Sequence, residues 1–276
     1  MTSQELQERF EEIRQMYVED NLSSTQIAKI FNVKRYQINY LLEKKGIQKS
    51  TSEARRKYYL NEHYFDNIDT PNKAYILGFL YADGYNNPIN HTIVLGLSAK
   101  DEDILERIRR EIPCDKPLGS YCTERKDGTP PRHMKILTLA SKYMSDTITK
   151  WGLCPNKTFI LQFPNFLSDK LIPHFIRGYF DGDGCAYLWK SKGTREDRIT
   201  VSIMSSTVFC LQMQKVLKEK ANINMHVNNA TGHTNNKLIR TSNRQEVQKF
   251  VEYIYKDADL YMVRKKEKFI EYFNRD

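Results

Sequence analysis

Two aspartates occupy the same position in two similar stretches of the chain, 100 residues apart. Residues 76–84 read ILGFLYADG and residues 176–184 read IRGYFDGDG, so Asp83 and Asp183 each come directly before a closing glycine. Carboxylates brought together in pairs bind hard divalent cations. The spacing therefore points first to a metal site built on Asp83 and Asp183.

Small residues recur at four-residue spacing in both stretches, and such residues share one face of a helix. A stripe of this kind lets two helix backbones approach closely, and we expect the stripes to pack against each other. We expect Gly84 and Gly184 to end the two helices in the left-handed conformation, which glycine adopts without strain. The residues expected at the helix interface are Ala74, Gly78, Gly178 and Gly182.

Packing of the two stripes would bring Asp83 and Asp183 side by side at two helix C-termini. The carboxylates would repel each other at the negative ends of two helix dipoles, and a divalent cation would remove this conflict. Hard oxygen ligands without neighbouring His or Cys favour Mg²⁺. The free backbone carbonyls of Ala82 and Gly182 are expected to complete its coordination.

The elements that carry the aspartates belong to an internal repeat. From residue 73 the chain twice shows a predicted helix, strand-like runs, a helix, two strand-like runs and a helix. We assign residues 73–160 to the first half and 161–276 to the second, with residues 157–170 joining them. Each half is predicted to be an α+β unit with an antiparallel sheet.

The two nonamers, with the run IDTPNKAYILGFLYADG that opens the first copy, resemble the paired motifs of the LAGLIDADG homing endonucleases over about residues 64–276. The resemblance implies a pseudo-twofold pair of αββαββα-like halves whose antiparallel saddle sheets lie in the major groove of DNA. It also implies site-specific double-strand cleavage with Mg²⁺, one phosphodiester per strand, as in intron homing. Mn²⁺ is expected to substitute, and Ca²⁺ to bind without supporting efficient cutting.

The family also carries a basic residue near each active site, where it would stabilise transition-state charge. Lys157 and Lys265 match that position best and are interpreted as catalytic. Lys266 is a close competitor of Lys265, and Lys135 ranks lower. The nonamers depart from the family pattern in having Tyr81 where the second copy has Asp181, and Arg177 at a position that is usually small or apolar.

The N-terminal region is predicted to be a small all-α helix-turn-helix domain over residues 1–50, followed by a linker over residues 51–72. Apolar residues at three- and four-residue spacing indicate one helix over 4–20 and a short helix, tight turn and longer helix from about residue 23. Polar residues on the last helix are expected to contact DNA. These are Lys34, Arg35, Gln37, Asn39, Lys44 and Lys45.

Composition supports a polyanionic partner, because 43 Lys and Arg against 34 Asp and Glu give a net charge of +9. No apolar run is long enough to cross a bilayer, and the five widely spaced cysteines indicate reduced thiols. We therefore expect a cytoplasmic monomer that binds a long site on double-stranded DNA. Two alternatives stay open: a DNA-binding regulator that does not cut, and an RNA maturase on the same fold.

Overall fold

The computed structural model describes residues 3–20, 22–48, 57–124, 129–155, 157, 160–190, 197–230 and 236–274. The chain forms two compact units, Met1–Tyr59 and Leu60–Asp276. No helix among the described residues is long and apolar enough to cross a membrane.

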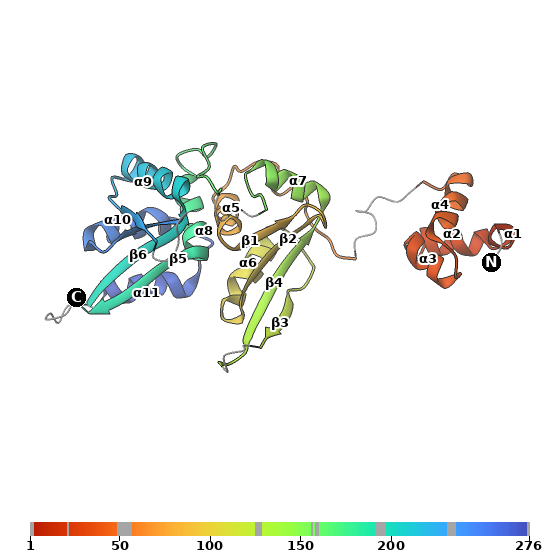
Figure 1. Ribbon diagram of the computed structural model, residues 1–276, viewed down its shortest axis with the longest axis horizontal. Coiled ribbons are helices and arrows are strands. Elements are labelled where there is room, and N and C mark those ends of the chain that lie inside the picture. The colour runs from red at the N-terminus through yellow and green to blue at the C-terminus, as the bar shows by residue number, and fades with distance from the viewer. Residues whose placement is uncertain are drawn as a thin grey trace. The chain divides into compact units, whose positions relative to one another are not determined.

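The first unit consists of helices around a small apolar core. Ile13, Ile27 and Ile38 are fully buried in that core. Ser23 begins the third helix with a capping box, because its hydroxyl accepts from the backbone N–H of Gln26, whose side chain accepts in return from the N–H of Ser23. The helices are α1 (Ser3–Glu8), α2 (Phe10–Val18), α3 (Ser24–Ile30) and α4 (Arg35–Lys44) (Figure 1). The expected all-α N-terminal unit is confirmed.

The first half of the second unit has the order αββαββα, with a short 3₁₀ turn before its middle helix. Its elements are α5 (Pro71–Asp83), β1 (Gly84–Asn87), β2 (Thr92–Ser98), η1 (Ala99–Asp101), α6 (Glu102–Glu111), β3 (Gly119–Thr123), β4 (Arg132–Ala140) and α7 (Lys142–Lys150).

The second half repeats this order and adds one helix. Its elements are α8 (Ile172–Asp183), β5 (Gly184–Lys190), β6 (Asp197–Ser206), α9 (Thr207–Ala221), β7 (His226–Asn229), β8 (Asn236–Thr241), α10 (Arg244–Tyr255) and α11 (Val263–Phe273).

Each half builds a four-stranded antiparallel sheet with the same connectivity. The strand orders are β1-β2-β4-β3 and β5-β6-β8-β7. The registers also correspond. At the start of the first strand of each half, Gly84 pairs with Leu95 and Gly184 pairs with Ile203. The expected α+β class and duplicated αββαββα-like halves are therefore confirmed.

The two helices that carry the motif aspartates, α5 and α8, lie between the two sheets (Figure 1). Residues 74–82 of α5 and 174–181 of α8 are all buried, as expected for helices covered on every side. Thr70 caps α5 by accepting from the N–H of Lys73, and Pro71 occupies the first turn, where no backbone donor is needed. The core of the second unit is therefore organised around this helix pair.

Three features differ from the sequence expectations. Strand β1, with sequence GYNN, was not predicted, because four residues with one large side chain carry no apolar alternation. Helix α11 was not predicted either, and it carries Lys265. Part of the expected linker is packed: Leu60, Tyr64 and Phe65 are buried in the core, and Trp151 donates from its indole to the carbonyl of Phe65 at 2.7 Å.

Candidate active site

The contact between α5 and α8 is reciprocal. A Cβ at Gly78 would overlap the carbonyl oxygen of Phe175, and one at Gly178 would overlap that of Tyr75. The two helices thus touch backbone to backbone through equivalent positions, which is a local pseudo-twofold relation. Ala74 is also fully buried in this core. Only glycine allows the close approach that brings the two helix ends together.

The C-terminal ends of the two helices place both aspartates at one site. A Cβ at Gly182 would overlap the methyl group of Ala82 and lie 3.2 Å from the Oδ2 atom of Asp83. Each helix ends at its aspartate, and Asp83 and Asp183 keep access to solvent although protein atoms surround much of each carboxyl group. The small residue at 182 therefore makes room for the carboxylate of the opposite motif.

The expectation that Gly84 and Gly184 adopt the left-handed conformation is wrong. Their φ angles are both −74°, with extended ψ angles, so any residue could adopt this backbone. The requirement for glycine is steric: a Cβ would lie 2.5 Å from the carbonyl oxygen of Leu80 at Gly84, and 2.5 Å from that of Phe180 at Gly184. The chain turns directly from helix into strand, which presses it against the last helical turn.

Two lysines lie at these helix ends. The ammonium group of Lys157 donates to the carbonyls of Leu80 and Gly84, at 2.6 Å each. The ammonium group of Lys265 donates to the carbonyls of Phe180, Gly182 and Gly184, at 2.7, 3.0 and 2.6 Å. Each lysine therefore compensates the negative end of one motif helix.

The charges of the site influence one another. Burial, and then the nearby charge of Asp183, raise the pKa of Asp83 to about 6, although Lys265 and Lys157 oppose the change. Burial also raises the pKa of Asp183. Burial lowers the pKa of each lysine to about 8, against the attraction of the carboxylates. The four groups thus form one electrostatic cluster in which the carboxylates are harder to ionise than usual.

The donor set is compatible with Mg²⁺ rather than with a metal held entirely by the protein. No group of three or more His, Cys, Asp and Glu side chains able to hold a metal occurs among the described residues. Two carboxylates suit Mg²⁺, which keeps several waters and uses substrate phosphate oxygens as ligands. Of the two carbonyls expected to assist, that of Gly182 already accepts from Lys265.

The other candidate lysines lie elsewhere. Lys135 forms an ion pair with Glu102 at 2.8 Å. The ammonium group of Lys266 lies 4.1 Å from the centre of the Tyr261 ring. Among the candidate lysines, the structure thus brings only Lys157 and Lys265 to the aspartates.

The part of the chain that contains the second motif matches a known family. Residues 171–255, from the residue before α8 to the end of α10, match the model of the LAGLIDADG-like domain. The matched segment spans less than half of the chain. It includes Asp183 and the whole second sheet, whereas Lys265 lies beyond it.

Solved structures similar to the chain include full-length DUF199/WhiA from Thermatoga maritima, with 17% identity and a TM-score of 0.46. That likeness covers 78% of this chain and 64% of WhiA. The LAGLIDADG homing endonuclease I-GzeII in complex with its DNA target has 9% identity and a TM-score of 0.49 over 74% of this chain and 89% of its own. The meganuclease I-AabMI bound to uncleaved DNA has 11% identity and a TM-score of 0.49, over 75% and 90%. No curated protein matches the chain.

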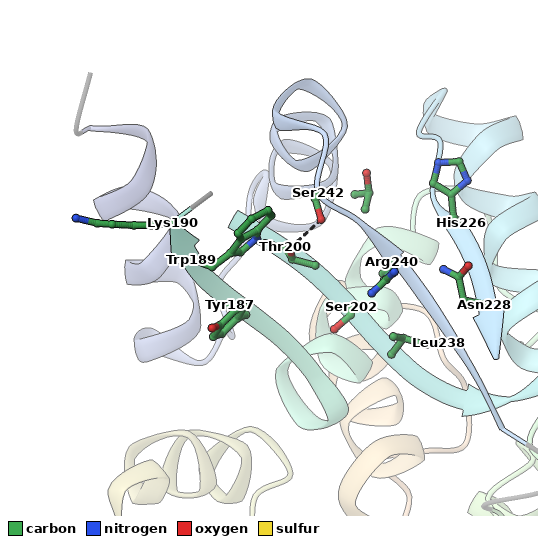
Figure 2. Close-up of a pocket in the computed structure, with 11 residues that line it drawn as sticks. Tyr187, Trp189, Lys190, Thr200, Ser202, His226, Asn228, Leu238, Arg240 and Ser242 are labelled. Carbon is green, nitrogen blue, oxygen red and sulfur yellow. Dashed lines mark hydrogen bonds between the residues drawn. The ribbon is translucent and has the colours of Figure 1, made fainter. Parts of the chain in front are cut away.

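The second sheet has an outer face rich in hydrogen-bonding side chains (Figure 2). This face forms an open hollow of about 810 Å³. Its polar groups come from all four strands and include Tyr187, Thr200, His226, Asn228 and Arg240. The alternate residues of β6, such as Val201 and Ile203, are fully buried on the other face. This face was not predicted from the sequence, although strand alternation could have revealed it.

The outer face of the first sheet carries both apolar and hydrogen-bonding side chains. Ile93 and Leu95 are buried, so Val94 and Gly96 face outward on β2. By the register, Gly96 pairs with Ile136, and Tyr121 pairs with Met134. The same face carries Tyr85 and Thr138, the partners of Val94 in the register, so it also offers hydrogen-bonding groups.

In the first unit, α4 presents a surface that only partly matches the expected DNA contacts. Lys34, Arg35, Lys44 and Lys45 are exposed and Asn39 is half-buried. The side-chain oxygen of Gln37 accepts from the N–H of Lys34 at 3.0 Å and so caps its own helix. Tyr36 and Tyr40, which were not predicted, are 66% and 63% exposed.

A buried polar network, which the sequence analysis missed, supports the second motif. The carboxylate of Asp181 accepts from Tyr75, Tyr255 and the N–H of Met262, at 3.0, 2.8 and 2.7 Å. Arg177, fully buried, donates to the carbonyls of Leu260 and Ile254 at 2.8 Å each. These bonds join α8 to α5, to the end of α10 and to the segment between α10 and α11.

Proposed function

We propose that the chain is a site-specific DNA endonuclease that acts as a monomer, each half cutting one strand with the help of Mg²⁺. The observation that carries this proposal is the meeting of Asp83, Asp183, Lys157 and Lys265 at two abutting helix ends. The net charge of +9 favours a polyanionic substrate, and the match to a LAGLIDADG-like domain supports a nuclease of that family.

The two aspartates are the proposed ligands of Mg²⁺, together with the carbonyl of Ala82, since that of Gly182 accepts from Lys265. Bound Mg²⁺ would activate a water and stabilise the charge on the leaving oxygen. The raised pKa of Asp83 fits this role, since a bound cation offsets both the burial and the repulsion from Asp183 that disfavour its ionised form. The lysines would hold positive charge beside each reacting phosphate.

The duplex would be recognised by separate surfaces of the chain. The hydrogen-bonding face of the second sheet suits the major groove, where base edges present donors and acceptors. On α4, the exposed tyrosines and basic residues form the second proposed reading surface. In the first unit, α1 and α2 contain Glu5, Glu8, Glu11 and Glu12, whereas α4 and its caps carry four basic residues. Two tethered DNA-binding units would give a longer site and tighter binding than either alone.

The test begins with plasmids that carry the region flanking the gene, together with a library of randomised targets. They are incubated with the protein in Mg²⁺, in Mn²⁺, in Ca²⁺ or in EDTA. We expect linear product with Mg²⁺ or Mn²⁺, and binding without efficient cutting in Ca²⁺. The control variants Asp83→Asn and Asp183→Asn should still bind DNA but make no double-strand breaks.

Each alternative reading predicts a different result. Specific binding by the wild type without cleavage in either metal would instead indicate a DNA-binding regulator. Tight binding to structured RNA, with weak binding to every duplex DNA, would indicate a maturase.

A further inference from the structure

Tyr81 makes a specific long-range contact from the first motif helix. Its hydroxyl donates to the carbonyl of Trp151, in the segment that leads to Lys157. Gly152 has a φ angle of +96°, and a Cβ there would overlap the hydroxyl oxygen of Tyr81. The segment is thus shaped to receive this hydroxyl, both by its backbone conformation and by the absence of a side chain.

Asp181 makes the corresponding contact from the second motif helix. It occupies the position of Tyr81 in the other nonamer, and its Oδ2 atom accepts from the N–H of Met262 at 2.7 Å. Met262 is the residue directly before α11, and its carbonyl accepts from the N–H of Lys265 at 3.1 Å. The carboxylate therefore holds the start of the helix that carries Lys265.

The same motif position is thus used twice for one purpose, with opposite hydrogen-bonding chemistry. A phenol donates to a carbonyl in the first half, and a carboxylate accepts from an N–H in the second. We propose that Tyr81 and Asp181 are positioning residues, each of which places the lysine of its own half, Lys157 or Lys265, for the cutting of one DNA strand. This inference rests on the proposed nuclease function.

Loss of the Asp181 contact should slow cutting more than loss of the Tyr81 contact. Asp181 is fully buried and accepts three hydrogen bonds, so its neutralisation would disturb a connected network. Tyr81 contributes one neutral hydrogen bond to the segment that leads to Lys157. Loss of the Tyr81 bond should slow one strand by about fivefold, the rate equivalent of one ordinary hydrogen bond. Loss of the Asp181 anchor should slow the other strand by about 100-fold, the effect of a small misplacement of a catalytic group.

The experiment compares Tyr81→Phe and Asp181→Asn with a matched control. Tyr179→Phe removes a buried hydroxyl from α8. This hydroxyl donates to Ser205 at 2.8 Å and contacts neither the segment before Lys157 nor the start of α11. Single-turnover cleavage at saturating protein is followed with each DNA strand labelled separately. Lys157→Met and Lys265→Met identify the strand served by each lysine. We expect Tyr81→Phe to slow the strand of Lys157, Asp181→Asn the strand of Lys265, and the control neither one selectively.

Amide hydrogen exchange, measured without metal or DNA, tests the contacts independently of activity. Asp181→Asn should speed exchange at Met262 by tenfold or more, about the loss of one charge-assisted hydrogen bond. Tyr81→Phe should speed exchange around Gly152 and leave Met262 unchanged. Equal slowing of both strands by either variant, or unchanged exchange at both segments, would overturn the positioning role. A wild type that cuts no DNA would overturn the nuclease proposal itself, which separates that failure from a failure of this inference alone.

Discussion

The two halves of the second unit place a lysine at the same point and support it differently. Lys265 lies on a regular helix, is 5% exposed and gives hydrogen bonds to three carbonyls. Lys157 is half-buried and gives hydrogen bonds to two carbonyls among the described residues. An ammonium group has three donors, so those of Lys265 are all engaged. The lysine ammonium group is therefore placed at the same point in both halves, whereas the hydrogen bonds that hold it there differ.

The interiors of the two motif helices differ in the same way. The first half has apolar Leu77 and neutral Tyr81 where the second has Arg177 and Asp181. His174, beside Arg177, has its pKa lowered to about 4 by burial, so its neutral ring accepts from the guanidinium at 2.8 Å. This polar interior joins α8 to the segment before α11, a helix with no counterpart among the described residues of the first half. Helix α11 and the buried network of Arg177 and Asp181 thus occur together in the second half.

The largest effect should come from removing the lysines. Lys157→Met and Lys265→Met should each lower the cutting rate at saturating protein by about 100- to 1,000-fold, as for other groups that stabilise transition-state charge. Lys265→Met should also lower the thermal midpoint more than Lys157→Met, because three carbonyls of a buried helix end lose their donor. Single-turnover kinetics and thermal denaturation measure the two effects. Unchanged cutting in both variants would leave the lysines with a purely structural role.

A smaller effect should distinguish a hydrogen-bonding side chain from an apolar one on the outer faces of the sheets. Arg240→Ala should reduce discrimination between matched and mismatched targets in one half-site by roughly 1–3 kcal/mol, the range for one good base contact. Ile136→Ala, on the outer face of the first sheet, should change discrimination much less, since an apolar side chain reads bases weakly. Binding titrations in Ca²⁺ against single-base variants of the target measure both. Equal losses of discrimination in Arg240→Ala and Ile136→Ala would contradict base reading through hydrogen bonds from these faces.

In the first unit, substitutions at two neighbouring residues of α4 should affect DNA binding and stability separately. Tyr36→Ala should weaken DNA binding and relax sequence preference, because the side chain is exposed on the proposed reading surface. Gln37→Ala should instead destabilise the unit by about 1 kcal/mol through loss of the helix cap. Affinity is measured by titration in Ca²⁺, and stability by denaturant unfolding. A loss of preference in Gln37→Ala without a loss of stability would restore the original expectation for that residue.

The smallest effect concerns the charge of Asp83 without metal. Its pKa is raised in the folded state from 3.8 to about 6, so stability that is present when the group is protonated is lost as the pH rises from about 4 through 6. Asp83→Asn cannot ionise and should escape this loss. In EDTA its thermal midpoint should exceed that of the wild type at pH 7, with a smaller difference at pH 5. Asp183→Asn should shift in the same direction. A lower midpoint for Asp83→Asn at pH 7 would contradict the electrostatic description of the site.

Much of the architecture follows from the sequence, because its signals are local or periodic. Helix and strand periodicities predicted the α+β halves, and the repeated order of elements predicted their duplication. The four-residue spacing of small residues predicted that the motif helices would approach closely. The pairing of Asp83 with Asp183 then follows from one register repeated in two helices. Strand β1 was not predicted, because four residues are too few to show a strand periodicity.

The tertiary structure decided how the site is supported, because those contacts join residues far apart in the chain. Lys265 reaches the end of α8, Tyr81 reaches Trp151, and no local pattern contains either pairing. The reason for glycine at 84 and 184 also changed, from backbone conformation to the space left by the preceding helical turn. Likewise, the side-chain oxygen of Gln37 caps α4, while Tyr36 is exposed. The sequence thus determined which groups meet, and packing determined which atoms hold them there, since hydrogen-bond partners depend on distances that only the folded chain defines.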